Sequence, residues 1–175
     1  MRYLALFLLI CLAACNGSGD YDRIIALRDR LEANPHDSQA LDRLLAYLSS
    51  NHWLDPANAA GCFRQLAESS ENKATVVPVI ALRVVPALVE HAEHVGREAT
   101  KALTEYGDYV LPYKDDLIAI IQKHPDEDIA WFAAEALGNL GRKAADALPV
   151  IDAMPIYETN RDLIEKAIGN IKEGN

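Results

Sequence analysis

The sequence lacks the motifs that mark many enzymes. It has no G-x-S-x-G nucleophile turn, no C-x-x-C pair and no glycine-rich phosphate loop placed after a strand. Aromatic residues make up only 7% of the 175 residues, and cysteine occurs three times. Without such a motif, catalysis is the weaker hypothesis. We expect no catalytic residue, no bound metal and no cofactor.

Positive charge is also scarce. The chain has 17 lysines and arginines against 26 aspartates and glutamates, which gives a formal net charge of −9 at pH 7. Nucleic acids and anionic lipid surfaces attract basic proteins, because lysine and arginine neutralise phosphates. The composition therefore argues against nucleic acid as a partner and against direct adhesion to anionic lipid.

The apolar run near the start of the chain is short. It extends over residues 3–12, about ten residues, whereas a helix that spans a bilayer needs about twenty. Because it follows Met1-Arg2, it is typical of a secretory signal peptide. Residues 12–15, Leu-Ala-Ala-Cys, resemble the bacterial lipoprotein box, in which cleavage leaves the cysteine as an acylated N-terminus.

This resemblance implies a signal peptide at 1–14, lipid on Cys15, a flexible tether through 15–20 and a folded domain at 21–175. The tether can reach at most about 17 Å, which keeps the folded part close to the membrane. Asn16 after the cysteine implies sorting to the outer membrane, facing the periplasm, in a Gram-negative cell. The alternative is an ordinary signal peptide with an incidental cysteine.

Cysteine usage fits this interpretation. If Cys11 leaves with the signal peptide and Cys15 carries lipid, Cys62 is the one remaining thiol and no intramolecular disulfide can form. Cys62 falls within a predicted helix, which favours a small buried apolar residue. A catalytic nucleophile would instead need a base close to it in space.

A helical pattern centred on residues 128–154 recurs along the chain. Apolar residues at steps of three and four predict one buried helix face, and they are Ile129, Phe132, Ala133, Ala136, Leu137 and Leu140. Small alanines on this face allow a second helix to approach closely. Gly138 and Gly141 are expected to end the helix, and Leu148-Pro149 to start the next one.

The segment EALGNLG at 135–141 aligns with KALTEYG at 101–107 and with KAIGNI at 166–171. A proline-started helix is expected before each copy, marked by Pro86, Pro112 and Pro149. Over roughly residues 84–173 the pattern resembles HEAT-type repeats, especially a short bacterial variety similar to phycobilisome-lyase repeats. The resemblance implies an all-α fold, an α-solenoid of about nine helices in antiparallel pairs.

The amino-terminal part also favours helices. Helices are predicted at 21–33, after a cap at Asp37 or Ser38, and at 57–69 after Asp55-Pro56. Trp53 and Leu54 are expected to pack back as a hydrophobic staple. The run at 73–92 contains Pro78 and Pro86, one of which must bend or divide the helix.

Two clusters of histidines and acids, at residues 90–94 and 124–128, contain residue types that could hold a divalent metal. Neither is an H-E-x-x-H motif, and neither guarantees a third ligand. A solvated helix end accounts for the first cluster. A turn between paired helices accounts for the second, because it needs a helix breaker and first-turn acids.

The predicted binding surface lies on the second helix of each repeat, because stacked repeats form an extended face that binds proteins. Alignment places Arg97, Trp131 and Asp162 in one column. A second column holds Lys101, Glu135 and Lys166, and a third holds Glu105, Asn139 and Asn170. Trp131 is the expected anchor, with Phe132 serving the core. The alternative is that Trp131 packs on a neighbouring helix.

We therefore expect a membrane-anchored lipoprotein of the bacterial cell envelope that acts as a non-catalytic protein-binding scaffold. Its partners would be another protein and, through the lipid, the membrane, but not nucleic acid. An alternative is an immunity or inhibitor lipoprotein that neutralises a toxin or hydrolase. A lyase-like enzyme is the weakest alternative, because no motif supports its chemistry.

Overall fold

The computed structural model of the protein describes residues 19–125 and 127–174, and every regular element in these ranges is a helix. This confirms the all-α prediction. The predicted signal peptide, Cys15 and most of the tether lie outside the described residues. The elements are α2 (Gly19–Ala33), α3 (Ser38–Tyr47), α4 (Asp55–Glu68), α5 (Ser70–Thr75), α6 (Val77–Glu90), α7 (Ala92–Val95), α8 (Arg97–Leu103), η1 (Gly107–Tyr113), α9 (Lys114–Lys123), α10 (Asp128–Gly138), η2 (Gly141–Ala147), α11 (Leu148–Asp152) and α12 (Arg161–Glu173).

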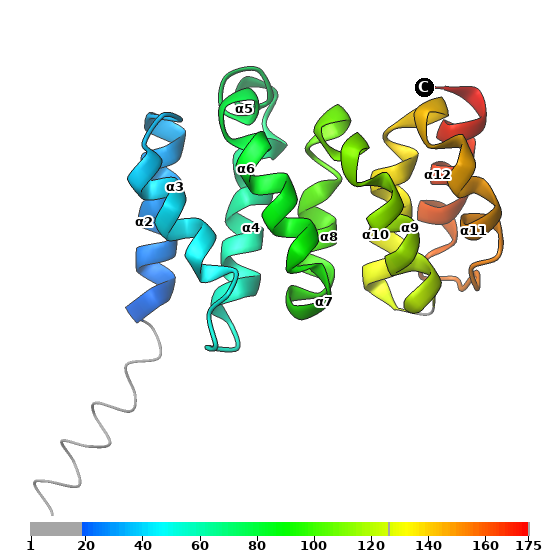
Figure 1. The fold of residues 1–175 in the computed structure, drawn as a ribbon, viewed down its shortest axis with the longest axis horizontal. Coiled ribbons are helices and arrows are strands. Elements are labelled where there is room, and N and C mark those ends of the chain that lie inside the picture. Colours follow the sequence, from blue (N-terminus) through cyan, green and yellow to red (C-terminus); the bar gives the residue numbers. More distant parts are fainter. Residues whose placement is uncertain (1–18, 126, 175) are drawn as a thin grey trace, which may run out of the picture.

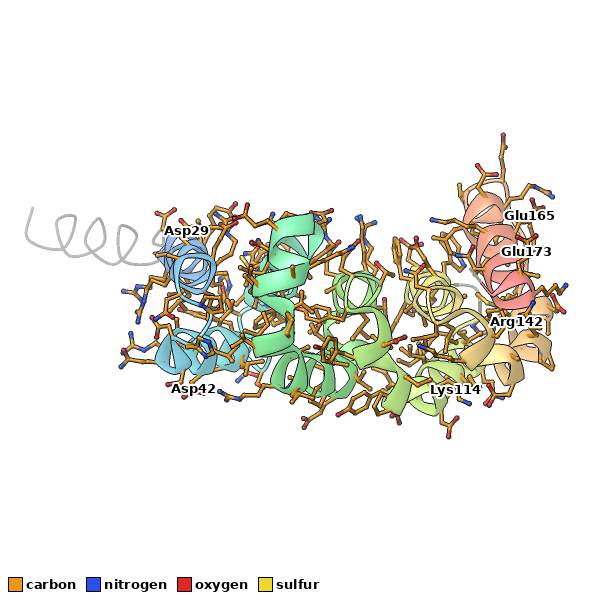
Figure 2. All side chains as sticks on the ribbon, turned by 90° about the horizontal axis from the view of Figure 1, so that it is seen from above. Asp29, Asp42, Lys114, Arg142, Glu165 and Glu173 are labelled. Carbon is orange, nitrogen blue, oxygen red and sulfur yellow. The ribbon has the colours of Figure 1, made fainter. Side chains whose placement is uncertain are left out.

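The helices form two rows (Figures 1 and 2). The first row consists of α2, α4, α8, α10 and α12, each packed against the next. The second row consists of α3, α6, α9 and α11, with the 3-10 helices η1 and η2. In Figure 2, Asp29 marks the outward side of the first row, and Asp42 and Lys114 mark the outward side of the second row. The apolar core runs between the two rows along the whole molecule.

One buried hydroxyl inside this core is hydrogen-bonded by the chain itself. Tyr106, which follows α8, is buried, and its hydroxyl donates a hydrogen bond to the carbonyl oxygen of Phe63 on α4 at 3.0 Å. Phe63 is also fully buried. This bond ties α4 to the end of α8, and it removes the penalty of leaving a hydroxyl unpaired in an apolar environment.

The start of α3 follows the predicted capping chemistry, but the start of α4 does not. The Asp37 carboxylate accepts a hydrogen bond from the Ala40 amide at 3.0 Å, and this bond, with help from Arg30, lowers the pKa of Asp37. At α4, the Asp55 carboxylate is buried and accepts from the Ser50 hydroxyl at 2.9 Å instead of capping the helix. The staple prediction is wrong for Trp53, because its side chain is 81% exposed.

The helical run at 73–92 is divided near Pro78 and not at Pro86. The break lies at Val76, between α5 and α6, and Pro78 occupies the first turn of α6, where an N–H has no intrahelical partner. Pro86 lies inside α6, which continues to Glu90, so the prediction that it starts a helix is wrong. The carbonyl left without a donor belongs to Leu82, in a part of the helix that faces solvent.

Two 3-10 helices stand where simple turns were expected. Pro149 lies in the first turn of α11, as predicted, whereas Pro112 lies inside η1 and not at the start of α9. The chain leaves α8 and α10 through Gly107 and Gly141, whose φ angles are +52° and +57°. Glycine adopts this backbone conformation without the steric penalty that other residues meet.

Candidate protein-binding face

The three helices that carry the predicted columns, α8, α10 and α12, are neighbours in the first row. Arg97, Asn139, Asp162 and Lys166 are exposed, and Lys101, Glu105, Trp131 and Glu135 are partly buried. On α10 the buried positions occupy the side toward the second row, which leaves positions 131, 135 and 139 one turn apart on the outward side. The structure therefore places these eight residues, and Asn170 as the ninth residue of the columns, on three adjacent helices or at their carboxyl ends, and we call the outward side of these helices the outer face.

The first column links two helices. The Arg97 guanidinium contacts the Glu98 carboxylate at 3.0 Å and the Asp128 carboxylate, at the start of α10, at 3.4 Å. The hydrogen bond to Glu98 is the main reason that the pKa of Arg97 is raised. Because these groups are largely exposed, the pairs add little to stability. They orient the Arg97 side chain along the outer face.

Trp131 is less available than expected. Its side chain is partly buried against the core, and its Nε1 is buried without a hydrogen-bond partner among the described residues. Trp131 lies seven residues before Gly138, so both occupy the same side of α10, the side that contacts Ala167 of α12. The structure thus favours the alternative in which Trp131 packs on a neighbouring helix.

Phe132 also differs from its predicted place. It is only partly buried, while the other predicted core positions of this helix are buried. The Lys101 ammonium lies 5.4 Å from the centre of the Phe132 ring, in the range of a cation–π contact. This contact joins α8 to α10 on the outer face. Sequence reasoning missed this contact, because the alignment pairs Lys101 with Glu135.

The third column surrounds a hollow. Glu105, Asn139 and Asn170 line a space of about 480 Å³ at the carboxyl ends of α8, α10 and α12. The Lys73 ammonium closes one side by pairing with the Glu105 carboxylate at 2.8 Å. The Asn139 amide donates to the Thr104 carbonyl at 3.0 Å, and its own oxygen accepts no hydrogen bond from the described residues. The hollow therefore offers donors and acceptors suited to a polar ligand.

The free cysteine and two members of the cluster at 90–94 have defined surroundings. Burial raises the pKa of the Cys62 thiol to about 11, so it stays protonated near neutral pH and is a poor nucleophile. His91 Nε2 lies 3.0 Å from the Ser49 hydroxyl, and Glu93 pairs with Lys123 at 2.5 Å. Within 19–125 and 127–174, no three residues of the metal-binding types come together to hold an ion.

Sequence reasoning missed a second hollow, of about 650 Å³, between α2 and α3. Arg23, Arg30 and Arg43 line it. Arg23 pairs with Asp20 at 3.0 Å and Arg30 with Asp37 at 2.7 Å, while Arg43 has no such partner among the described residues. These arginines lie at steps of seven residues or more on two different helices, so only the packing of α2 on α3 brings them together.

The described part of the chain contains no helix that is both long and apolar enough to cross a membrane. Comparison with protein-family models, with curated proteins and with solved structures gives no match.

Proposed function

We propose that this chain is a lipid-anchored, non-catalytic scaffold of the bacterial cell envelope that binds another protein through its outer face. The observation that carries the proposal is the alignment of α8, α10 and α12 side by side, with the three polar columns on one side. We further infer that the two rows form an α-solenoid of HEAT-like antiparallel helix pairs. The recurrence of the EALGNLG pattern on consecutive helices of the first row supports this inference.

The size of the row agrees with a protein partner. The helices of the first row are about 18 Å long on average and lie about 9 Å apart. Together they present an outward surface of roughly 800 Å². One partner in a stable complex contributes about the same area. Because α8, α10 and α12 alone would supply roughly 500 Å², we expect the partner also to enter the hollow at Asn139 or to extend onto α4.

The charges on the outer face are mixed. Arg97, Lys101 and Lys166 stand beside Glu105, Glu135 and Asp162, so the predicted columns carry no net charge. Such a pattern acts mainly on partner choice and on the rate of association, and less on the final affinity. Trp131→Ala is a poor probe of this surface, because the indole packs against the core and its removal would also lower stability.

Glu135→Lys should weaken capture of the partner while leaving the melting temperature nearly unchanged. Glu135 is partly exposed in the middle column, so reversal of its charge would slow association several-fold and alter its salt dependence. The measurement is the association rate of the protein captured from detergent-solubilised envelope, with co-eluting proteins identified by mass spectrometry. Asp116→Lys is the matched control, because Asp116 is an exposed acid on α9, in the second row.

Equal behaviour of the two variants would contradict the outer face as the binding surface. A partner that binds tightly and in equal stoichiometry, and that loses an enzymatic or toxic activity on binding, would favour the immunity or inhibitor alternative.

Cys15→Ser should abolish the lipid anchor. The hydroxyl cannot form the thioether that links diacylglycerol to the chain, so we expect unprocessed or mislocalised protein. Intact mass of the mature wild-type chain, together with membrane fractionation, measures this. Cys11→Ser is the control. It should leave the mass of the mature chain and its membrane location unchanged, because Cys11 lies in the segment that we propose is removed. A wild-type N-terminus without acyl groups would contradict the proposed location.

A further inference from the structure

Large exposed apolar side chains gather at one end of the helices. Seven such side chains occur among the described residues, and five of them lie in the first turn of α2, between α3 and α4, or between α11 and α12. Figure 1 shows these three segments at the lower end of the molecule. The five residues are Tyr21, Trp53, Leu54, Ile156 and Tyr157, and the other two are Leu82 on α6 and Leu111 on η1.

Trp53 is the most exposed of these residues, at 81%. Its loop is nevertheless held firmly. The buried Asp55 carboxylate accepts from the Ser50 hydroxyl at 2.9 Å and contacts His52 Nδ1 at 3.2 Å, and the Ser50 hydroxyl accepts from the His52 amide at 3.2 Å. The loop is therefore built around Asp55, with the indole directed away from the core. Water exposure of a whole indole is unfavourable, so a surface that covers it would be stabilising.

The proposed lipid attachment lies close to this end. The helix α2 starts here, and Cys15 stands four residues before Gly19, a distance of at most about 14 Å along the chain. We propose that Tyr21, Trp53 and Leu54, which we call the docking edge, contact the headgroup region of the bilayer that holds the lipid anchor. This inference rests on the lipid anchor in the proposed function.

A bilayer fits the docking edge because tryptophan and tyrosine concentrate where lipid headgroups meet water. The charges nearby are close to balanced. Arg23 pairs with Asp20 at 3.0 Å, Asp22 is exposed, and Arg43 has no acidic partner in the part of the chain that the structure describes. Contact should therefore depend on apolar burial and little on salt or on lipid charge, in agreement with the acidic composition of the chain.

Docking at this edge would orient the molecule. The hollow lined by Glu105, Asn139 and Asn170 lies at the opposite end of the helices (Figure 1), so it would point away from the bilayer. The outer face would then stand upright on the membrane and remain open to a partner along its length. An anchor alone would leave this orientation undefined.

The test uses the full-length, lipidated protein in phosphatidylcholine vesicles. Trp131→Phe leaves Trp53 as the only tryptophan, since the chain has two. Quenching by acyl-brominated phosphatidylcholine reports contact with lipid, and quenching by acrylamide reports contact with water. The control protein carries Trp53→Phe, Trp131→Phe and Leu82→Trp, which places a single indole at a position that is 78% exposed on the second row.

We expect brominated lipid to quench Trp53 but not the indole at position 82. We also expect acrylamide to quench Trp53 at least about threefold less than the control indole, with little change at raised ionic strength. Equal accessibility of the two indoles on vesicle-bound protein would overturn the docking edge and leave the scaffold and its anchor intact. Protection from acrylamide without quenching by lipid would also overturn it, since a second copy of the chain, and not the bilayer, would then cover Trp53. Failure of the wild-type protein to float with vesicles would overturn the anchor and the docking edge together.

Discussion

Ala133→Asp should be the most damaging single substitution considered for this protein. Ala133 lies in the middle of α10 and is fully buried. A carboxylate at this position would lose its hydration without gaining a partner, and unpaired buried charges cost about 3–5 kcal/mol. In a chain of this size, a loss of 1 kcal/mol in the free energy of unfolding lowers the melting temperature by roughly 2–4 °C. A fall of about 10 °C in melting temperature is therefore expected. Thermal unfolding followed by far-UV circular dichroism measures it.

The pH dependence separates charge from volume in this variant. Desolvation would raise the pKa of the introduced carboxyl above its ordinary value of about 3.9, so the folded state would bind the extra proton more tightly than the unfolded state. The added instability should therefore grow as pH rises from about 4 through the raised pKa, and it should be complete above that pKa. Ala119→Asp, at an exposed position of α9, is the control and should cost less than about 1 kcal/mol. A melting temperature of the Ala133→Asp protein within a degree or two of wild type would contradict the assigned core face.

The sequence predicts the helices best where local chemistry decides them. Ile129, Ala136 and Leu137 recur at helical spacing, and all three are buried in α10. Asp37 is an effective cap because its carboxylate needs only the amide three residues later. Pro78 divides the run at 73–92 because a first-turn proline loses no hydrogen bond. Each of these outcomes depends on residues within one or two turns of each other.

The differences arise where several contacts compete for one side chain or one segment. Asp55 has the pattern of a helix cap, but Ser50 and His52 engage its carboxylate first, and Trp53 is left outside the core. The 3-10 helices η1 and η2 have no periodicity that distinguishes them from a turn followed by an α-helix. Short-range patterns cannot resolve such choices, because the deciding contacts are set by packing.

Some features of the candidate site could likewise be predicted from the sequence, and others could not. The 34-residue and 31-residue offsets place the columns on adjacent helices, because equivalent positions of equivalent helices share a side. The hollow at Asn139 could not be foreseen, since Lys73 and Val77 reach it from a different part of the chain. Trp131 and Phe132 differ from their predicted places: Trp131 packs against the core, on the side of α10 where the close approach of α12 occurs at Gly138, and Phe132 lies under the Lys101 ammonium.

That close approach gives the second large prediction, at Gly138. A methyl group on Gly138 would lie 2.7 Å from Ala167 Cα and 2.9 Å from its Cβ, closer than carbon atoms can pack. The obstacle is backbone, which no side-chain rotation can relieve, so α12 would have to move away from α10. Overpacking of this kind costs about 1–3 kcal/mol, more than the gain of up to about 1 kcal/mol from replacing glycine by alanine in a helix. We expect Gly138→Ala to lower the melting temperature by several degrees.

Gly169 provides a matched control, because it occupies the same position of the repeated pattern on α12. Apart from its chain neighbours and the backbone of its own helix, no atom lies within 4 Å of where its Cβ would stand. Gly169→Ala should therefore act through helix propensity alone and raise stability by about 0.5–1 kcal/mol. The two substitutions are chemically identical and should have opposite signs, since Gly138 has a neighbouring helix in the row and Gly169 faces open space. A rise in melting temperature for both would mean that α10 and α12 do not approach as closely as described, and the packing of the first row would have to be revised.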